Sequence, residues 1–207
     1  MKFIKSISFF LLIFVVTFNQ FSAQISKSKK QELIRYAREM SSKQIKYGET
    51  WKPNDRELNY VMDCSNTLLY SYDRIFDVRL PRTSLDQFNY VKKNGKFHAS
   101  ENLINGSGEI DIDKIRKSLQ IGDILFWENT YNVSHNPPVS HVMIYLGKNK
   151  DGRMKMFGAG SYGSGEQTTN GGIDVYVFDP NRFMGCVKSS TGKCKINGRF
   201  IGYGRIL

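Results

Sequence analysis

The middle of the chain reads DCSNTLLYSYDRIF over residues 63–76. Apolar side chains recur behind Cys64 at helical spacing, so the stretch predicts a helix that starts near the cysteine; they are Leu68, Leu69, Tyr72 and Ile75. The N-terminal end of a helix favours negative charge and so favours the thiolate form of a cysteine placed there. We therefore expect Cys64 to be a reactive thiol, with a buried and inert cysteine as the alternative.

A second stretch, residues 140–147, reads SHVMIYLG and predicts a strand with His141 near its start. On its own, a histidine on such an apolar strand is typical of a protein core. Opposite a cysteine, a histidine can take the thiol proton and later protonate a leaving amine. The combination therefore predicts that Cys64 is a nucleophile and His141 its general base.

The pattern changes along the chain from helices to strands. Helices are expected over residues 28–47, 64–76 and 84–91, with a brief turn at 114–119, and the Gly- and Asn-rich segment 94–113 is expected to be a surface excursion. Strands are expected over residues 123–127, 139–146, 154–157, 173–178 and 200–206. This order predicts an α+β protein with N-terminal helices packed on a central antiparallel sheet of about five strands.

Residues 1–23 have the features of a signal peptide. Lys2 and Lys5 form a basic start, residues 7–18 are almost wholly apolar, and Ala23 is a small residue at a plausible cleavage point. The alternative is an uncleaved membrane anchor. We expect export to the periplasm or the cell exterior, no stable membrane insertion after cleavage, and one domain over residues 24–207 that works as a monomer.

The chain is basic, with a formal net charge of +11, and loss of Lys2 and Lys5 would leave +9. An exported basic protein suits anionic polymers such as cell-wall glycans, although the charge can also serve solubility alone. Nucleic acid is not expected as a partner, because no cluster of Lys and Arg alternates with aromatic residues.

The chain has three cysteines, and two of them bracket a polar loop at residues 187–193. In an oxidising compartment Cys186 and Cys194 can form a disulfide, which leaves Cys64 as an unpaired thiol that needs a reason. The alternative is that all three are reduced. The three histidines and three cysteines show no ligand spacing, so we expect no metal and no cofactor.

Four segments, in this order, resemble the NlpC superfamily of papain-like cell-wall cysteine peptidases over roughly residues 47–160. They are Asp63-Cys64-Ser65, Leu80-Pro81-Arg82-Thr83-Ser84 with Gln87, LQIGDILF at residues 119–126, and residues 140–147. The resemblance implies a papain-like fold in a single NlpC-type catalytic domain. It also implies hydrolysis of amide bonds in peptidoglycan stem peptides, often beside a D-configured residue.

The resemblance also implies a third polar residue that orients the histidine from the next strand. That position falls on or near Gly158, which has no side chain. Ser161, Gln167 or a water is then expected to replace it, or the enzyme works as a dyad. The family's tyrosine before the cysteine corresponds to Tyr47, 17 residues upstream of Cys64, which requires an insertion near residues 51–56; Tyr60 is nearer but in the wrong context.

Five residues are candidates for substrate binding or for the oxyanion site: Tyr47, Asp63, Ser65, Arg82 and Ser140. Asp63 can instead cap the helix or accept a structural hydrogen bond, and Arg82 can instead form a structural ion pair.

Three functions fit these observations. The intact pair of Cys64 and His141 favours a secreted cysteine peptidase acting on peptidoglycan. The missing third residue favours a non-catalytic wall-binding module of the same fold. An antibacterial peptidoglycan amidase effector would use the same chemistry, and the sequence does not separate it from a housekeeping enzyme.

Overall fold

The computed structural model describes residues 25–48, 61–161, 163 and 165–207. The expected signal peptide at residues 1–23, the insertion expected near residues 51–56, and Tyr60 lie outside the described residues.

The described chain holds four α-helices, one short 3-10 helix and eight strands. The helices are α1 (Lys27–Ser42), α2 (Cys64–Phe76), α3 (Ser84–Lys93), η1 (Ser100–Leu103) and α4 (Ile112–Ser118). The strands are β1 (Phe97–Ala99), β2 (Ile124–Glu128), β3 (Val139–Lys148), β4 (Met154–Gly160), β5 (Gly172–Val177), β6 (Cys186–Lys188), β7 (Cys194–Asn197) and β8 (Arg199–Gly204).

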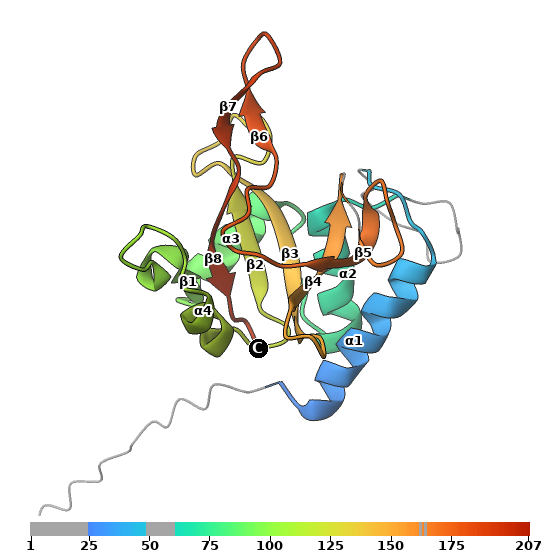
Figure 1. Ribbon diagram of the computed structural model, residues 1–207. Helices are drawn as coiled ribbons and strands as arrows, with labels where there is room; N and C mark the ends of the chain where they lie inside the picture. Colours follow the sequence, from blue (N-terminus) through green and yellow to red (C-terminus); the bar gives the residue numbers. More distant parts are fainter. Residues whose placement is uncertain (1–24, 49–60, 162, 164) are drawn as a thin grey trace, which may run out of the picture.

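Six strands form one antiparallel sheet in the order β1-β8-β2-β3-β4-β5, while β6 and β7 form a separate hairpin that projects from it (Figure 1). The prediction of an α+β fold is confirmed, and the sheet has one strand more than the five expected. The sixth strand is β1, which pairs with β8 inside the segment 94–113 that we expected to be a surface excursion. Three residues are too few to show the alternating pattern by which a strand is recognised.

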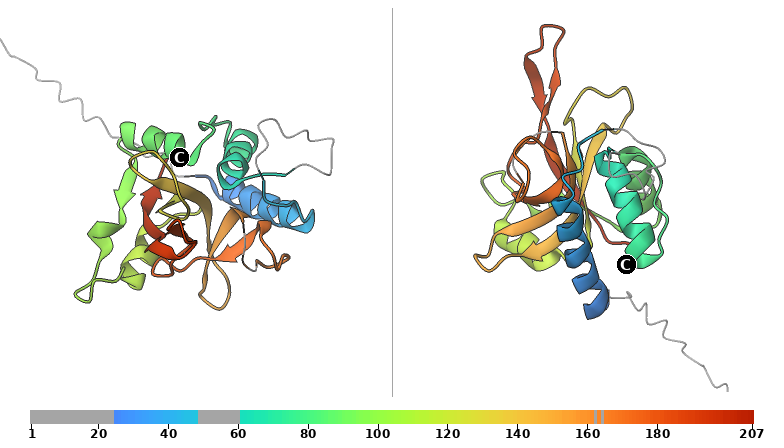
Figure 2. Two further views of the ribbon diagram at one scale, coloured as in Figure 1. Left: turned by 90° about the horizontal axis from the view of Figure 1, so that it is seen from above. Right: turned by 90° about the vertical axis from the view of Figure 1, so that its right-hand side faces the viewer.

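The sheet separates two hydrophobic cores, because successive side chains of a strand point to opposite faces. Along β3, Val142 and Ile144 belong to the core beneath α1, α2 and α3, while Met143 and Tyr145 belong to the second core. Figure 2 shows α1 and α2 along the same side of the sheet. Helix α2 contacts β3, so its N-terminus is held beside the strand that carries His141.

Helix α1 ends at Ser42, five residues earlier than the sequence predicts. Gln44 has a positive φ of 50°, which turns the chain, and Tyr47 then forms a parallel bridge with Met62. Two backbone hydrogen bonds hold this bridge, from Gly48 N to Met62 O and from Met62 N to Lys46 O, both 3.2 Å. The early end of the helix therefore brings Tyr47 next to the start of α2.

Candidate active site

Cys64 is the first residue of α2, and Asp63 is the N-cap of that helix. The Asp63 carboxylate accepts a hydrogen bond of 2.7 Å from the backbone N–H of Asn66, which satisfies one of the free N–H groups of the first turn. The Cys64 side chain is free of any disulfide and is buried, with 5% of the residue exposed. The sequence prediction of a cysteine at the head of a helix is thus met.

Two groups from other parts of the chain reach the Cys64 sulfur. The backbone N–H of Val142 on β3 donates a hydrogen bond to it. The Tyr47 hydroxyl is also hydrogen-bonded to it. Because Val142 is the next residue after His141, the fold brings the thiol to the part of β3 that carries the histidine.

His141 is buried, and its ring lies edge-on to the ring of Trp127, with 5.8 Å between the ring centroids. Trp127 is the register partner of His141 on the neighbouring strand β2. The Nε2 atom of His141 is buried without a hydrogen-bond partner among the described residues. Ring packing against Trp127 therefore helps to position the imidazole, and no described side chain bonds to its Nε2.

Burial decides the protonation of both groups. It raises the pKa of Cys64 to about 12, with the Asp63 charge adding to the effect and the N–H groups of Val142, Ser65 and Cys64 opposing it. Burial lowers the pKa of His141 to about 4, against an opposing contribution from Asp63. The thiol and the imidazole are thus both neutral near pH 7. Desolvation thus outweighs the favourable helix end in setting the pKa of Cys64, and the reactivity expected of this thiol stays a prediction.

Asp63, Ser65 and Arg82 form one hydrogen-bonded cluster. The two terminal nitrogens of Arg82 donate to the two carboxylate oxygens of Asp63 over 3.1 and 2.7 Å. Arg82 also donates to the Ser65 hydroxyl over 2.8 Å, and Ser65 donates to Asp63 over 3.0 Å. These contacts match the alternatives of a helix cap and a structural ion pair, and they account for the three side chains without a substrate.

Ser140 is fully buried on β3. Its hydroxyl accepts a 2.9 Å hydrogen bond from the backbone N–H of Thr130 and lies 2.8 Å from the Thr130 hydroxyl. The side chain therefore fastens the loop after β2 to β3. This use explains Ser140 without direct substrate binding.

At Gly158, the position expected for the third residue, the side chain of Met143 occupies the space that a larger residue would need. A Cβ added at Gly158 would lie 2.4 Å from the sulfur of Met143, which is on the same face of β3 as His141. The space of an orienting side chain is thus taken by Met143. Gly158 does not have a positive φ, so the close contact with Met143, and not the backbone conformation, is what restricts this position to glycine.

The two expected substitutes for the third residue lie near the site without bonding to His141 Nε2. Ser161 is exposed and lines the same cavity as His141. Gln167 lies in a neighbouring depression that Ser161 and Tyr47 also border, and its backbone N–H donates to Asp174 over 2.7 Å. The role of an orienting residue stays a prediction for both.

A cavity of about 760 Å³ opens beside His141 and Tyr47. Apolar side chains from β3, β4 and β5 form its floor, namely Met143, Met156 and Tyr176. The other lining residues are Thr130, Tyr131, Asn132, Gly160, Ser161, Met184, Gly185, Cys186, Lys188 and Cys194. Sequence analysis missed this wall from the β6–β7 hairpin, because the pairing of Cys186 with Cys194 says nothing about which surface the hairpin covers.

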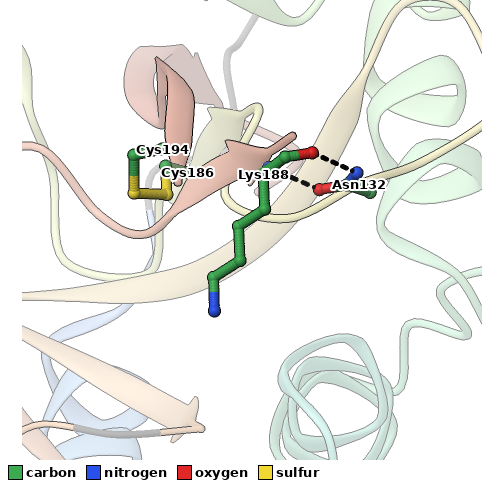
Figure 3. The surroundings of a disulfide bond; sticks show 4 residues. All are labelled: Asn132, Cys186, Lys188 and Cys194. Atoms are coloured by element: carbon green, nitrogen blue, oxygen red, sulfur yellow. Dashed lines mark hydrogen bonds between the residues drawn. A yellow bond between two sulfur atoms is a disulfide. The ribbon is translucent and has the colours of Figure 1, made fainter. Parts of the chain in front are cut away.

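The disulfide expected between Cys186 and Cys194 is present and joins β6 to β7, with 5.6 Å between the two Cα atoms. Figure 3 shows it beside Lys188 and Asn132. Asn132 exchanges two hydrogen bonds with the Lys188 backbone, so the hairpin is tied to the loop after β2.

Among the residues that the structure describes, no three His, Cys, Asp or Glu side chains lie together as metal ligands would. No helix in those residues combines the length and apolar character needed to cross a membrane.

Comparison with curated proteins finds no significant match. The model of the NlpC/P60 family matches residues 42–157, which is more than half of the chain and includes Tyr47, Cys64 and His141. The fold agrees with this match, since helices pack on an antiparallel sheet with the cysteine at a helix start. The chain therefore belongs to the NlpC/P60 family, a family of cell-wall peptidases of the cysteine type.

Proposed function

We propose that this protein is an exported cysteine peptidase that hydrolyses amide bonds in peptidoglycan stem peptides. The observation that carries the proposal is the position of the Cys64 sulfur, at the head of α2 and against the N–H of Val142, the residue that follows His141 on β3. Family membership supports a cell-wall substrate. Export is proposed from residues 1–23 of the sequence.

In the proposed reaction the Cys64 sulfur attacks the carbonyl carbon of the scissile amide while its proton passes to His141. The tetrahedral intermediate collapses, the C–N bond breaks, and the imidazolium of His141 gives its proton to the leaving amine. A water molecule, deprotonated by His141, then attacks the thioester, and the thiol is regenerated with release of the carboxylic acid.

The oxyanion of the intermediate needs hydrogen-bond donors that are already in place. The N–H groups of Cys64 and Ser65 are near the sulfur, and they belong to the positive end of α2. The Tyr47 hydroxyl is hydrogen-bonded to the same sulfur. We assign the oxyanion site to these donors, which leaves Asp63 and Arg82 to hold the first turn of the helix.

The neutral state of both groups affects when the nucleophile forms. A pKa of about 12 for Cys64 and of about 4 for His141 disfavours a preformed thiolate and imidazolium. We therefore expect the Cys64 proton to pass to His141 in the same step in which the sulfur attacks the carbonyl carbon of the bound substrate.

The test is digestion of intact peptidoglycan and of soluble muropeptides with the mature protein, starting at residue 24, followed by mass spectrometry. New amine and carboxylate ends at one amide position are expected. The matched control is Cys64→Ala, which removes the sulfur and keeps a small side chain. Equal release of products by this variant, or no release by the wild type, would overturn the proposal.

One observation favours a second function, a wall-binding module that does not cleave. His141 Nε2 has no partner among the described residues, so the base lacks the orientation that a third residue provides. A binding module would co-sediment with peptidoglycan and would leave its amide bonds intact under the same digestion.

A further inference from the structure

The cavity beside His141 has an uneven distribution of charge. Its walls are mostly apolar or neutral, with Met143, Met156 and Tyr176 at the floor. Among the described residues that line it, Lys188 is the one side chain with a full charge, since burial keeps His141 neutral. No Asp or Glu is found among those lining residues. A single cation at an apolar pocket matches a ligand with a carboxylate on an aliphatic arm.

Lys188 is fixed in place through its backbone. Its N–H donates to the side-chain oxygen of Asn132 over 2.7 Å, and its C=O accepts from the Asn132 amide over 2.9 Å. The disulfide between Cys186 and Cys194 joins β6, which ends at Lys188, to β7. Three links therefore fix the position of the Lys188 backbone: the pairing of β6 with β7, the disulfide and the contact with Asn132.

The ammonium group of Lys188 is available to a ligand. Within the described part of the chain it forms no ion pair. Figure 3 shows the side chain extending away from both the disulfide and Asn132. A fixed backbone with an unused charge at a pocket is an arrangement suited to recognition rather than to stability.

We propose that Lys188 determines specificity by binding a free carboxylate of the stem peptide whose neighbouring amide bond is cut. This inference rests on the proposed peptidase function and names the chemical group that the site selects. In this proposal, the aliphatic part of the substrate residue that bears the carboxylate packs against Met143 and Met156. Lys188 lies outside the matched residues 42–157, so this selection belongs to the C-terminal hairpin of this chain.

The expected size of the effect follows from the chemistry of the contact. A hydrogen bond between two charged groups contributes roughly 1.5–3 kcal/mol, which corresponds to about a 10- to 100-fold change in affinity. Amidation of the carboxylate removes the charge and leaves the shape almost unchanged, so it isolates the contribution of Lys188.

The experiment compares a synthetic stem peptide that has its free carboxylates with versions in which each carboxylate is amidated in turn. For the wild type, one amidation should raise KM about 10- to 100-fold. For Lys188→Gln, the KM for the acid peptide should rise to the value that the wild type shows with the amidated peptide. The same amidation should then leave the KM of this variant unchanged. Lys193→Gln is the matched control, because Lys193 is exposed on the same hairpin and does not line the cavity.

Equilibrium binding to the Cys64→Ala protein separates the two proposals. A preference for the acid peptide that Lys188→Gln removes supports the inference even where no hydrolysis occurs. Equal affinity for acid and amidated peptides, or an unchanged preference in Lys188→Gln, overturns it while leaving peptidase activity intact. Circular dichroism of each variant confirms that the fold is retained.

Discussion

The Cys64 sulfur accepts a hydrogen bond from the backbone N–H of Val142, one residue beyond His141. One contact thus ties the head of α2 to the start of β3. A shift of β3 by one residue would exchange the faces of His141 and Val142, so the register of the sheet sets the geometry of the site.

Replacement of Cys64 by serine should abolish hydrolysis and keep the fold. The hydroxyl is a weaker nucleophile with a higher pKa, and a neutral His141 whose Nε2 has no partner among the described residues activates it poorly. We expect less than about 1% of the wild-type kcat/KM, in line with the loss of covalent nucleophiles elsewhere. Mass spectrometry of digested peptidoglycan measures this, and a melting curve checks the fold. Turnover above that level would contradict the assignment of Cys64.

Stability should fall as the pH drops from about 6.5 to about 4, with His141 responsible for part of the loss. The folded protein holds the pKa of His141 at about 4, below its ordinary value, so the unfolded chain binds more protons in this window. The contribution is on the order of 3 kcal/mol. His141→Gln should therefore flatten the dependence of the free energy of unfolding on pH, measured by urea unfolding. An unchanged slope would show that the imidazole is not buried in its neutral form.

A carboxamide placed at position 158 should help only when Met143 is shortened. Gly158→Asn alone forces a Cβ to within 2.4 Å of the present Met143 sulfur, and overpacking of this kind typically costs about 1–3 kcal/mol. Met143→Ala with Gly158→Asn makes room for a polar group on the face that carries His141. We expect kcat/KM about 2- to 10-fold above that of Met143→Ala, the gain from one hydrogen bond. No gain over that single variant would exclude an orienting role at this position.

Loss of the disulfide should loosen the hairpin and leave the chemistry in place. Cys186→Ser with Cys194→Ser opens a loop of about nine residues, for which the chain-entropy estimate is roughly 2–3 kcal/mol. Thermal unfolding should show the loss, and hydrolysis should persist because Cys64 and His141 lie on other elements. An unaltered melting temperature would mean that the hairpin unfolds independently of the domain.

The ion pair of Arg82 with Asp63 should be worth far more than an exposed pair. Both side chains are mostly buried, with 14% and 11% exposed, so Arg82→Gln leaves a carboxylate without its partner at the head of α2. A loss of about 2–4 kcal/mol in the free energy of unfolding is expected. Arg79→Gln is the control, because Arg79 is 92% exposed in its pair with Asp73 and should change stability little. Similar losses in the two variants would contradict this role of the Asp63 cluster.

Local patterns in the sequence were enough for several features. The apolar spacing behind Cys64 predicts α2, and the observed helix begins and ends where the pattern does. The strand that carries His141 and the pairing of Cys186 with Cys194 also follow from residues close together in the chain. Helical and strand periods are local properties, which is why these elements are readable without a structure.

Other features depended on contacts between distant residues. Burial raises the pKa of Cys64 to about 12 and lowers that of His141 to about 4, and the position of the cysteine at a helix end does not reveal this desolvation. The ion pair of Arg82 with Asp63 joins residues 19 positions apart, so no local pattern reveals it, and substrate binding by Arg82 stays a prediction. The need for a glycine at position 158 comes from Met143 on the neighbouring strand, whose sulfur would clash with a Cβ there.

The sequence by itself determined the fold class, the thiol at the head of a helix and the histidine on a strand. Each of these follows from the periodicity of apolar residues or from the order of segments along the chain. The tertiary structure decided which groups are desolvated, which charges neutralise one another and which wall of the cavity carries Lys188. These properties arise from the packing of separate elements against one another, and no local pattern of residues encodes the environment that such packing creates.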